Sequence, residues 1–298
     1  MAGSALRIIR PLIRLSSFVA PKTAGHLAFK AFCTPQRRQQ GTAKRKAATK
    51  ATSERLAGAT RHAIPYPCGS VTAYLFEPKG QQSSGSAPPT VILLHGWTSE
   101  AAFMTAFVAP LTAAGFRVVA YDLPAHGDST GSELNIPLGV ASLAAVARAF
   151  APVHAIVTHS FGGAIAMAAL ARTVPGQPTV TANRLALIAA PSSITEITRQ
   201  FGTTIGLGRR GQAALERRIH VVAGNPVEAF EGREQLAAIA KPTLVIHCRD
   251  DRELGFHHAE ALGAAGPCVT LEPMKGLGHR RILQAKAVVE SVSRFVAG

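Results

Sequence analysis

The sequence contains little cysteine, with four residues among 298, and none of them has the CxxC spacing typical of zinc sites. Cys33, Cys68, Cys248 and Cys268 are scattered, which also argues against a disulfide framework and fits a reducing compartment. In the N-terminal segment no uncharged apolar run reaches the length of a secretory signal core, and nothing approaches a membrane span. We therefore expect a cytoplasmic protein that uses neither a metal ion nor a cofactor.

Acidic residues are also scarce, at 17 Asp and Glu against 32 Lys and Arg, for a net charge of +15. The excess lies in residues 1–62, which hold 13 of the basic residues and one acid, Glu54, while the remainder is nearly balanced. The basic run lacks interleaved aromatic residues and any recognisable reading module, so we expect no nucleic-acid partner.

Arg7, Arg10 and Arg14 recur at helical spacing near the N-terminus, with apolar residues on the other faces. Three interpretations of this basic arm remain open. It could lie peripherally on an anionic membrane surface, or serve as an organellar transit peptide. It could also be a solvated helix packed loosely on the domain and followed by a disordered linker at residues 37–55.

Beyond residue 62, segments typical of strands and helices alternate. Strand patterns occupy residues 62–78 (a hairpin), 90–96, 116–127, 153–159, 182–191, 241–251 and 268–273, and helical patterns occupy 100–115, 138–151, 164–170 and 280–298. This alternation predicts an α/β fold with a mainly parallel sheet of about eight strands and helices on both faces. We expect residues 1–62 to form the arm and linker, and residues 63–298 to form the domain.

One segment interrupts the alternation. Between residues 192 and 240 no strand pattern occurs, whereas residues 209–224 and 226–240 have the composition of short helices. An insertion after the carboxyl end of a strand lies where parallel sheets bind ligands. We therefore expect residues 192–240 to form a small helical cap.

Polar residues able to act together follow the predicted ends of four strands. They are His95-Gly96-Trp97, Ser160, the pair Asp250 and Asp251, and His279. Because the carboxyl ends of parallel strands meet at one edge, these side chains are expected to lie close together. A serine hydroxyl becomes a useful nucleophile when a histidine takes its proton and a carboxylate fixes that histidine.

Ser160 lies where a strand pattern, residues 153–159, meets a helical pattern. A side chain exposed at so sharp a turn forces a strained backbone and brings strand and helix together, and Gly162 and Gly163 relieve this crowding. The helix N-terminus then directs backbone N–H groups toward a developing oxyanion.

From residue 63 onward the chain resembles the α/β-hydrolase fold serine hydrolases of the esterase and lipase kind. The matching segments are "HGW" at the oxyanion loop, "DLPAHGDS", "HSFGG" at the nucleophile elbow, "HCRDD" at the acid strand and "GLGHRRIL" at the histidine loop. Thr158 replaces the first glycine of the family's G-x-S-x-G, and Ala125 replaces a common glycine in "GHGDS". We expect a slightly shifted but competent elbow.

The resemblance implies roles for individual residues. Ser160 would be the nucleophile, His279 the general base and then acid, and Asp251, in preference to Asp250, the orienting carboxylate. The backbone N–H groups of Phe161 and Trp97 would form the oxyanion hole, in a substrate-binding loop with His95 and Gly96. The expected reaction is hydrolysis of a small acyl ester or thioester through an acyl-enzyme on Ser160.

Other interpretations stay open at this level. The same fold could support an acyltransferase or an aminopeptidase-like enzyme, and a non-catalytic binding protein would predict a damaged triad. Trp97, Phe161 and Phe103 could line an acyl pocket or pack in the core. The pair His257–His258 suggests a metal site, but no ligand cluster accompanies it in the sequence, so we expect solvated helix residues. The arginines of the cap, residues 209–218, are interpreted as a solvated face.

Overall fold

The computed structural model describes residues 2–35, 51–78 and 87–298. Most of the linker predicted at residues 37–55 lies outside the described residues, and its last part, residues 51–55, is helical. Among the residues described, no helix combines the length and apolar character needed to cross a bilayer.

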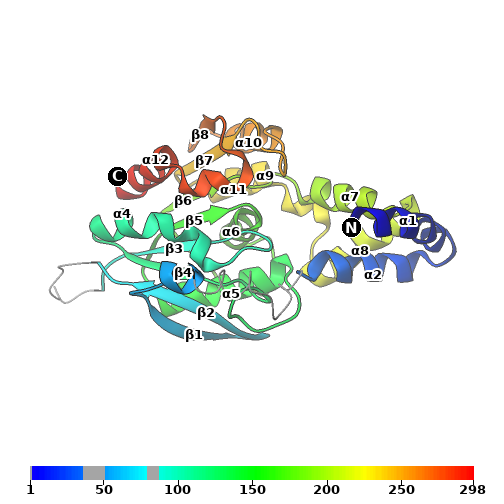
Figure 1. Cartoon of the computed structure of the whole chain (residues 1–298), viewed down its shortest axis with the longest axis horizontal. Coiled ribbons are helices and arrows are strands. Elements are labelled where there is room, and N and C mark those ends of the chain that lie inside the picture. Colours follow the sequence, from blue (N-terminus) through cyan, green and yellow to red (C-terminus); the bar gives the residue numbers. More distant parts are fainter. Residues whose placement is uncertain (1, 36–50, 79–86) are drawn as a thin grey trace.

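A single eight-stranded sheet forms the centre of the molecule, in the order β1-β2-β4-β3-β5-β6-β7-β8 (Figure 1). β1 and β2 form an antiparallel hairpin, β2 pairs antiparallel with β4, and all later pairs are parallel. The strands are β1 (Thr60–Tyr66), β2 (Gly69–Phe76), β3 (Thr90–Leu94), β4 (Arg117–Tyr121), β5 (Val153–His159), β6 (Arg184–Ile188), β7 (Thr243–Cys248) and β8 (Val269–Met274). The predicted fold class is confirmed, and the hairpin begins three residues before the predicted domain boundary.

Helices cover both faces of the sheet because successive strand side chains point to opposite sides. In β3, Val91 and Leu93 belong to one apolar core and Ile92 and Leu94 to the other. The first core includes η1 (Ala101–Phe107), α4 (Val108–Ala113), η3 (Ile282–Gln284) and α12 (Lys286–Ala297). The second includes α5 (Ile136–Ala149), α6 (Phe161–Leu170), α9 (Gly232–Ile239) and α10 (His257–Gly263).

The helix predicted at residues 100–115 is divided. Residues 101–107 form the 3-10 helix η1, and the α-helix α4 begins only at Val108. Pro110 explains the break, since it has no N–H to donate to a preceding carbonyl and is tolerated only in the first turn of an α-helix.

The segment between β6 and β7 is helical, and it contains one helix that the sequence analysis missed. Ser193 is the N-cap of this helix, α7 (Ile194–Ile205), and its side chain accepts a hydrogen bond from the Glu196 N–H. Serine followed three residues later by glutamate is a start signal that could have revealed it. α8 (Arg209–Ala223) and η2 (Val227–Phe230) follow, whereas α9 contacts α6 and α10 and so belongs to the layer on the sheet.

The N-terminal helices α1 (Ala2–Val19) and α2 (Pro21–Cys33) lie against α8, at one end of the molecule (Figure 1). The packing is close: a Cβ atom placed on Gly25 of α2 would lie 2.5 Å from Cβ of Ala214. Ser17 of α1 is buried, and its hydroxyl accepts a hydrogen bond from the Gly208 N–H at 3.0 Å. These helices therefore pack closely against α8, which lies within the segment for which the sequence predicts a cap, and are not loosely attached.

Candidate active site

Ser160 occupies a sharp turn between β5 and α6. Its φ of 50° and ψ of −124° are strained for a residue with a side chain, and its N–H donates to the Ile188 carbonyl at 2.9 Å. Gly162 is required next to it, because a Cβ there would lie 2.6 Å from the His95 carbonyl oxygen. Thr158, in place of the usual glycine, is buried in β5 and donates to the Ala186 carbonyl at 3.1 Å, so the substitution is accommodated within the strand.

The structure brings Ser160, His279 and Asp251 together from three separate strand ends. His279 Nε2 lies 3.1 Å from Ser160 Oγ, and His279 Nδ1 lies 2.7 Å from Asp251 Oδ2. With the Nδ1 proton donated to the carboxylate, Nε2 is left as an acceptor for the serine proton. This is the arrangement that a nucleophilic serine requires.

Asp251 is held as a carboxylate by several donors. Its Oδ1 accepts from the N–H groups of Glu253 and Leu254, at 2.8 and 2.9 Å, and His247 Nε2 lies 3.4 Å from its Oδ2. Burial alone raises the pKa of this carboxyl, but the hydrogen bonds from His247, His279 and Leu254 outweigh it, and its pKa falls well below the ordinary value.

The neighbouring Asp250 has a different contact. Its Oδ2 accepts from the Gly276 N–H at 2.7 Å, in the loop that carries His279. Gly276 and Gly278 both have positive φ, at 75° and 65°, which allows this loop to turn sharply before His279. Asp250 therefore anchors the histidine loop, while Asp251 contacts the histidine.

His159 lies directly beside His279, with ring centroids 4.8 Å apart. Its Nε2 lies 2.9 Å from the His279 carbonyl oxygen and therefore donates to it. Burial, reinforced by the neighbouring His279, lowers the pKa of His159 to about 4. His159 is thus neutral at pH 7 and fixes the backbone of His279.

The His95 side chain also forms hydrogen bonds to backbone groups, and it does not line the cavity. Its Nε2 accepts from the Leu123 N–H at 2.9 Å, and Nδ1, which must then carry the proton, donates to the Gly96 carbonyl at 2.7 Å. Burial lowers its pKa to about 3, so the ring is neutral. A Cβ on Gly96 would lie 2.8 Å from Ser160 Cβ, so the loop leading to Trp97 runs directly against the serine.

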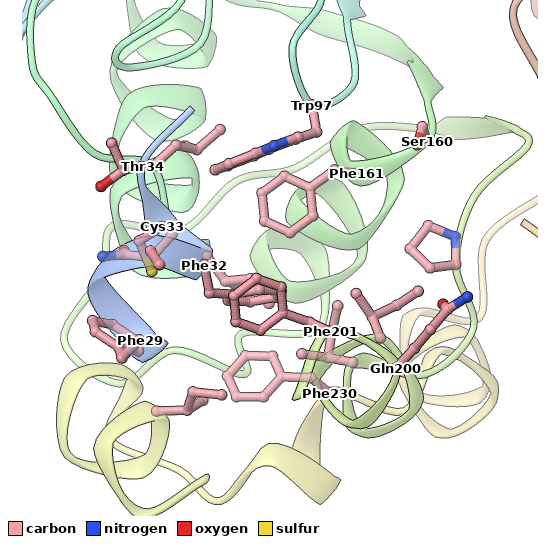
Figure 2. A pocket seen from close by; sticks show the side chains of 18 of the residues that line it. Phe29, Phe32, Cys33, Thr34, Trp97, Ser160, Phe161, Gln200, Phe201 and Phe230 are labelled. Atoms are coloured by element: carbon pink, nitrogen blue, oxygen red, sulfur yellow. The ribbon is translucent and has the colours of Figure 1, made fainter. Parts of the chain in front are cut away.

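A cavity of about 570 Å³ adjoins Ser160 and His279 and is strongly aromatic (Figure 2). Helix α2 contributes to it as well as α7, η2 and the loops of the domain. Its aromatic lining consists of Phe29, Phe32, Trp97, Phe161, Phe201 and Phe230. Glu253 is the only Asp, Glu, Lys or Arg among its lining residues, all of which lie in the described part of the chain. The cavity therefore fits an apolar group attached to a polar reacting centre.

Two open questions from the sequence are answered by this lining. Trp97 and Phe161 line the cavity, whereas Phe103 does not. The Arg55 guanidinium lies over the Phe103 ring instead, with Cζ 5.5 Å from the ring centroid. Cys33 also lines the cavity, but burial raises the pKa of its thiol to about 12, so it stays protonated. None of the arginines at 209–218 is among the lining residues.

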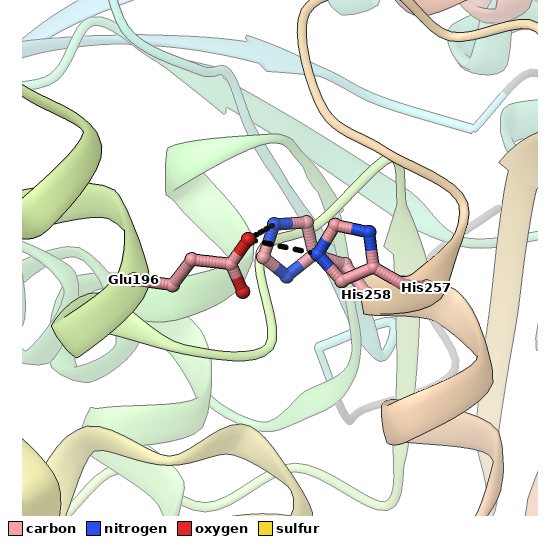
Figure 3. Close-up of side chains that lie close together, drawn as sticks. All are labelled: Glu196, His257 and His258. Carbon is pink, nitrogen blue, oxygen red and sulfur yellow. Dashed lines mark hydrogen bonds and ion pairs between the residues drawn. The ribbon is translucent and has the colours of Figure 1, made fainter. Parts of the chain in front are cut away.

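Among the described residues, Glu196, His257 and His258 form a group whose ligand atoms lie within 4.8 Å of one another (Figure 3). Glu196 Oε1 lies 2.9 Å from His257 Nε2 and 3.8 Å from His258 Nε2. The expectation of two solvated histidines is wrong for His258, which is buried and contacts Ser192 Oγ at 2.9 Å. The sequence could not show this group because Glu196 lies 61 residues away along the chain. None of its members lines the cavity, and it ties α7 to α10.

Comparison with solved structures shows the same fold in several hydrolases. A bacterial membrane phospholipase A is 21% identical, with a TM-score of 0.60, over 85% of this chain and 91% of the other. Est1E from Butyrivibrio proteoclasticus is 20% identical, with a TM-score of 0.60, over 80% of this chain and 97% of the other. The naproxen esterase of Bacillus subtilis is 15% identical, with a TM-score of 0.59, over 86% of this chain and 99% of the other.

No curated protein sequence is significantly similar to the chain. A family model does match it, over residues 91–291, a segment that includes the elbow, both aspartates and His279. The match covers well over half of the chain. The chain therefore belongs to the alpha/beta hydrolase family.

Proposed function

We propose that the protein is a serine hydrolase that cleaves a carboxylic ester or thioester through an acyl-enzyme on Ser160. The observation that carries this proposal is the chain of contacts from Ser160 Oγ to His279 Nε2, at 3.1 Å, and from His279 Nδ1 to Asp251, at 2.7 Å. Two of the structurally similar proteins are esterases, and their similarity to this chain is one of fold.

In the first half-reaction His279 Nε2 takes the Ser160 proton while Oγ forms a bond to the substrate carbonyl carbon. The carbonyl oxygen becomes an oxyanion, for which the backbone N–H groups of Phe161 and Trp97 are the proposed donors. The tetrahedral intermediate then collapses, the bond to the leaving oxygen or sulfur breaks, and His279 returns the proton to that leaving group. The products of this step are the acyl-enzyme and a free alcohol or thiol.

In the second half-reaction a water molecule gives its proton to His279 Nε2 and attacks the acyl carbon. The second tetrahedral intermediate releases the carboxylic acid and returns the proton to Ser160 Oγ. Asp251 keeps His279 in the required tautomer and stabilises its charged form in both halves. His159, Asp250 and His95 act by positioning, through the backbone around His279 and Gly96.

The proposed substrate is a small molecule with an apolar acyl group. The cavity offers about 570 Å³ and an aromatic wall, which suit an acyl chain better than an acetyl group alone. One of the structurally similar proteins is a membrane phospholipase A, which makes lipid-derived esters a reasonable part of the substrate panel.

A fluorophosphonate probe tests the nucleophile directly. We expect the wild type to be labelled and Ser160→Ala to be unlabelled, with Ser293→Ala, a serine of α12 that does not line the cavity, labelled like the wild type. Nitrophenyl esters of increasing acyl length should then show rising kcat/KM beyond acetate. Equal labelling of the wild type and Ser160→Ala would refute the proposal, and acyl transfer to added alcohols in preference to water would favour an acyltransferase.

A further inference from the structure

We infer that the outward face of the N-terminal helices docks on an anionic lipid surface through its phosphate headgroups. The inference concerns binding and does not depend on the proposed chemistry at Ser160. Among the described residues, the large exposed apolar side chains gather in one region of the fold. All seven large ones lie on α1, α2 and α8, with exposed fractions between 46% and 73%, and they are called the outer apolar face: Ile9, Leu12, Leu15, Phe18, Val19, Leu27 and Val221.

The orientation of α1 is the reverse of that expected for a helix on a water-soluble domain. Leu12, Leu15 and Val19 share one side of the helix, at spacings of three and four residues, and this side is exposed. The opposite side carries Ser17, which is buried and hydrogen-bonded to the Gly208 N–H of the loop before α8. We therefore expect a partner outside this domain to cover the exposed apolar side of α1.

The charge around the outer apolar face indicates which kind of partner it binds. Helices α1, α2 and α8 together hold nine Lys and Arg and one acid, Glu216. The Glu216 carboxylate is already engaged, with Arg199 Nε at 3.3 Å. Apolar side chains flanked by an excess of basic ones are the composition of helices that lie in the interface of an anionic membrane. A surface that bound a second copy of the same chain would bring these positive charges against one another.

A hollow lies on the opposite side of α1 from Leu12 and Leu15, next to the loop before α8. It lies between α1 and α7 and is lined by Arg10, Pro11, Arg14, Thr203, Gly206 and Leu207. Arg10 is held there by its own hydrogen bond to the Thr203 carbonyl, at 3.2 Å, and Arg14 lies one turn further along α1. Arg10 and Arg14 therefore belong to the packed side of α1.

The basic residues that flank the outer apolar face are Lys30, Arg210 and Arg217. Arg210 lies over the Phe18 ring, 4.8 Å from its centroid, and Lys30 and Arg217 are exposed one turn from Leu27 and Val221. Cationic groups beside exposed apolar side chains suit the phosphates of lipid headgroups.

The same helices also line the cavity beside Ser160. α2 contributes Phe29, Phe32 and Cys33 to that cavity from its inner side, while Leu27 faces outward. Ala31 and Thr34, at the C-terminal end of α2, line the cavity and are themselves exposed, so the cavity reaches the surface there. A lipid surface docked on these helices would therefore lie close to the cavity entrance.

Vesicle co-sedimentation tests the inference, in the Ser160→Ala background so that no chemistry is involved. Two vesicle types are compared, phosphatidylcholine alone and phosphatidylcholine with about one-third phosphatidylglycerol. We expect binding to the anionic vesicles that falls at least tenfold at high salt, because exposed charges are then screened. The double variant L12E/L15E should lower the partition coefficient at least tenfold, and K30Q/R217Q should remove most of the preference for phosphatidylglycerol.

The matched control is Q284E/A287E, which adds the same two charges at exposed positions near α12, at the other end of the molecule (Figure 1). It should bind vesicles like the parent protein, and all variants should keep the thermal midpoint of the parent within about 3 °C. Vesicle binding that is absent, or that is equal in L12E/L15E and the control, would overturn the inference. A parent protein that is dimeric by light scattering, with a monomeric L12E/L15E variant, would instead assign the face to self-association and would equally overturn it.

Failure of this test leaves the proposed function standing, because fluorophosphonate labelling of Ser160 is measured without vesicles. Conversely, an unlabelled wild type that binds anionic vesicles would retain the docking surface and refute the hydrolase proposal.

Discussion

Gly25 of α2 lies so close to Ala214 of α8 that a Cβ on residue 25 would be 2.5 Å from the alanine Cβ and 2.6 Å from its carbonyl carbon. This contact joins the N-terminal segment to α8, about 190 residues later in the chain. Since α2 also supplies Phe29, Phe32 and Cys33 to the cavity, the close approach helps to determine the shape of that cavity.

Gly25→Ala should therefore displace α2 and widen the cavity. We expect KM for long-chain esters to rise several-fold, with little change for an acetyl ester, and the free energy of unfolding to fall by about 1–3 kcal/mol from overpacking. Steady-state kinetics on esters of two chain lengths measure the effect. Thr23→Ala, at an exposed position of the same helix, is the control. Unchanged long-chain kinetics in Gly25→Ala would show that α2 does not shape the acyl site.

The two adjacent aspartates should differ sharply on mutation. Asp251→Asn removes the carboxylate that holds His279 Nδ1–H and is expected to lower kcat by about 1,000- to 10,000-fold. Asp250→Asn keeps an oxygen that can accept from the Gly276 N–H and should lower kcat by less than about tenfold. Nitrophenyl ester hydrolysis compares the two variants. Equal losses in both would mean that the contact of Asp251 with His279 has no special role.

Acid should destabilise the protein through His159. Its folded-state pKa of about 4 lies below the ordinary value of 6.5, so the unfolded chain takes up the proton first as the pH falls. The folded protein therefore loses stability as the pH falls from about 6.5 toward 4, by about 2 kcal/mol from this group between pH 7 and pH 5. His159→Phe should reduce the loss between these two pH values by that amount.

Urea unfolding of the wild type and His159→Phe at pH 7 and pH 5 measures the difference. Because each protein is compared with itself, the hydrogen bond to the His279 carbonyl, which is lost at both pH values, largely cancels. The same loss of stability in both proteins would show that His159 is not held neutral.

At the end of α9, glycine substitutions at two nearby alanines should change the stability of the protein in opposite directions. Ala240 has a left-handed backbone, with φ 47° and ψ 38°, and is exposed. Ala240→Gly should stabilise the protein by up to about 1 kcal/mol, because glycine adopts this conformation without steric cost. Ala237→Gly, at an exposed position inside the same helix, should destabilise it by about 1 kcal/mol. Chemical denaturation of both variants checks the pair, and a shared sign would contradict the strain argument.

The sequence alone determined the sheet and the order of the reacting residues. Its strands are short β-branched runs, its helices are alanine-rich, and Ser160, Asp251 and His279 each follow a strand. Such patterns are local, so they can be recognised without the rest of the structure. The choice of Asp251 over Asp250 depended on resemblance, since either could follow β7.

Only the tertiary structure decided the placement of α1 and α2 and the partners of His258. The contact of Gly25 with Ala214 requires two helix surfaces that match in shape. Small residues such as these form no periodic pattern in the sequence from which the match could be predicted. Glu196 meets His257 for a similar reason, because the first turns of α7 and α10 come together from distant parts of the chain. Local patterns determine which elements form, whereas the cavity beside Ser160 depends on side chains brought together across the whole chain by packing.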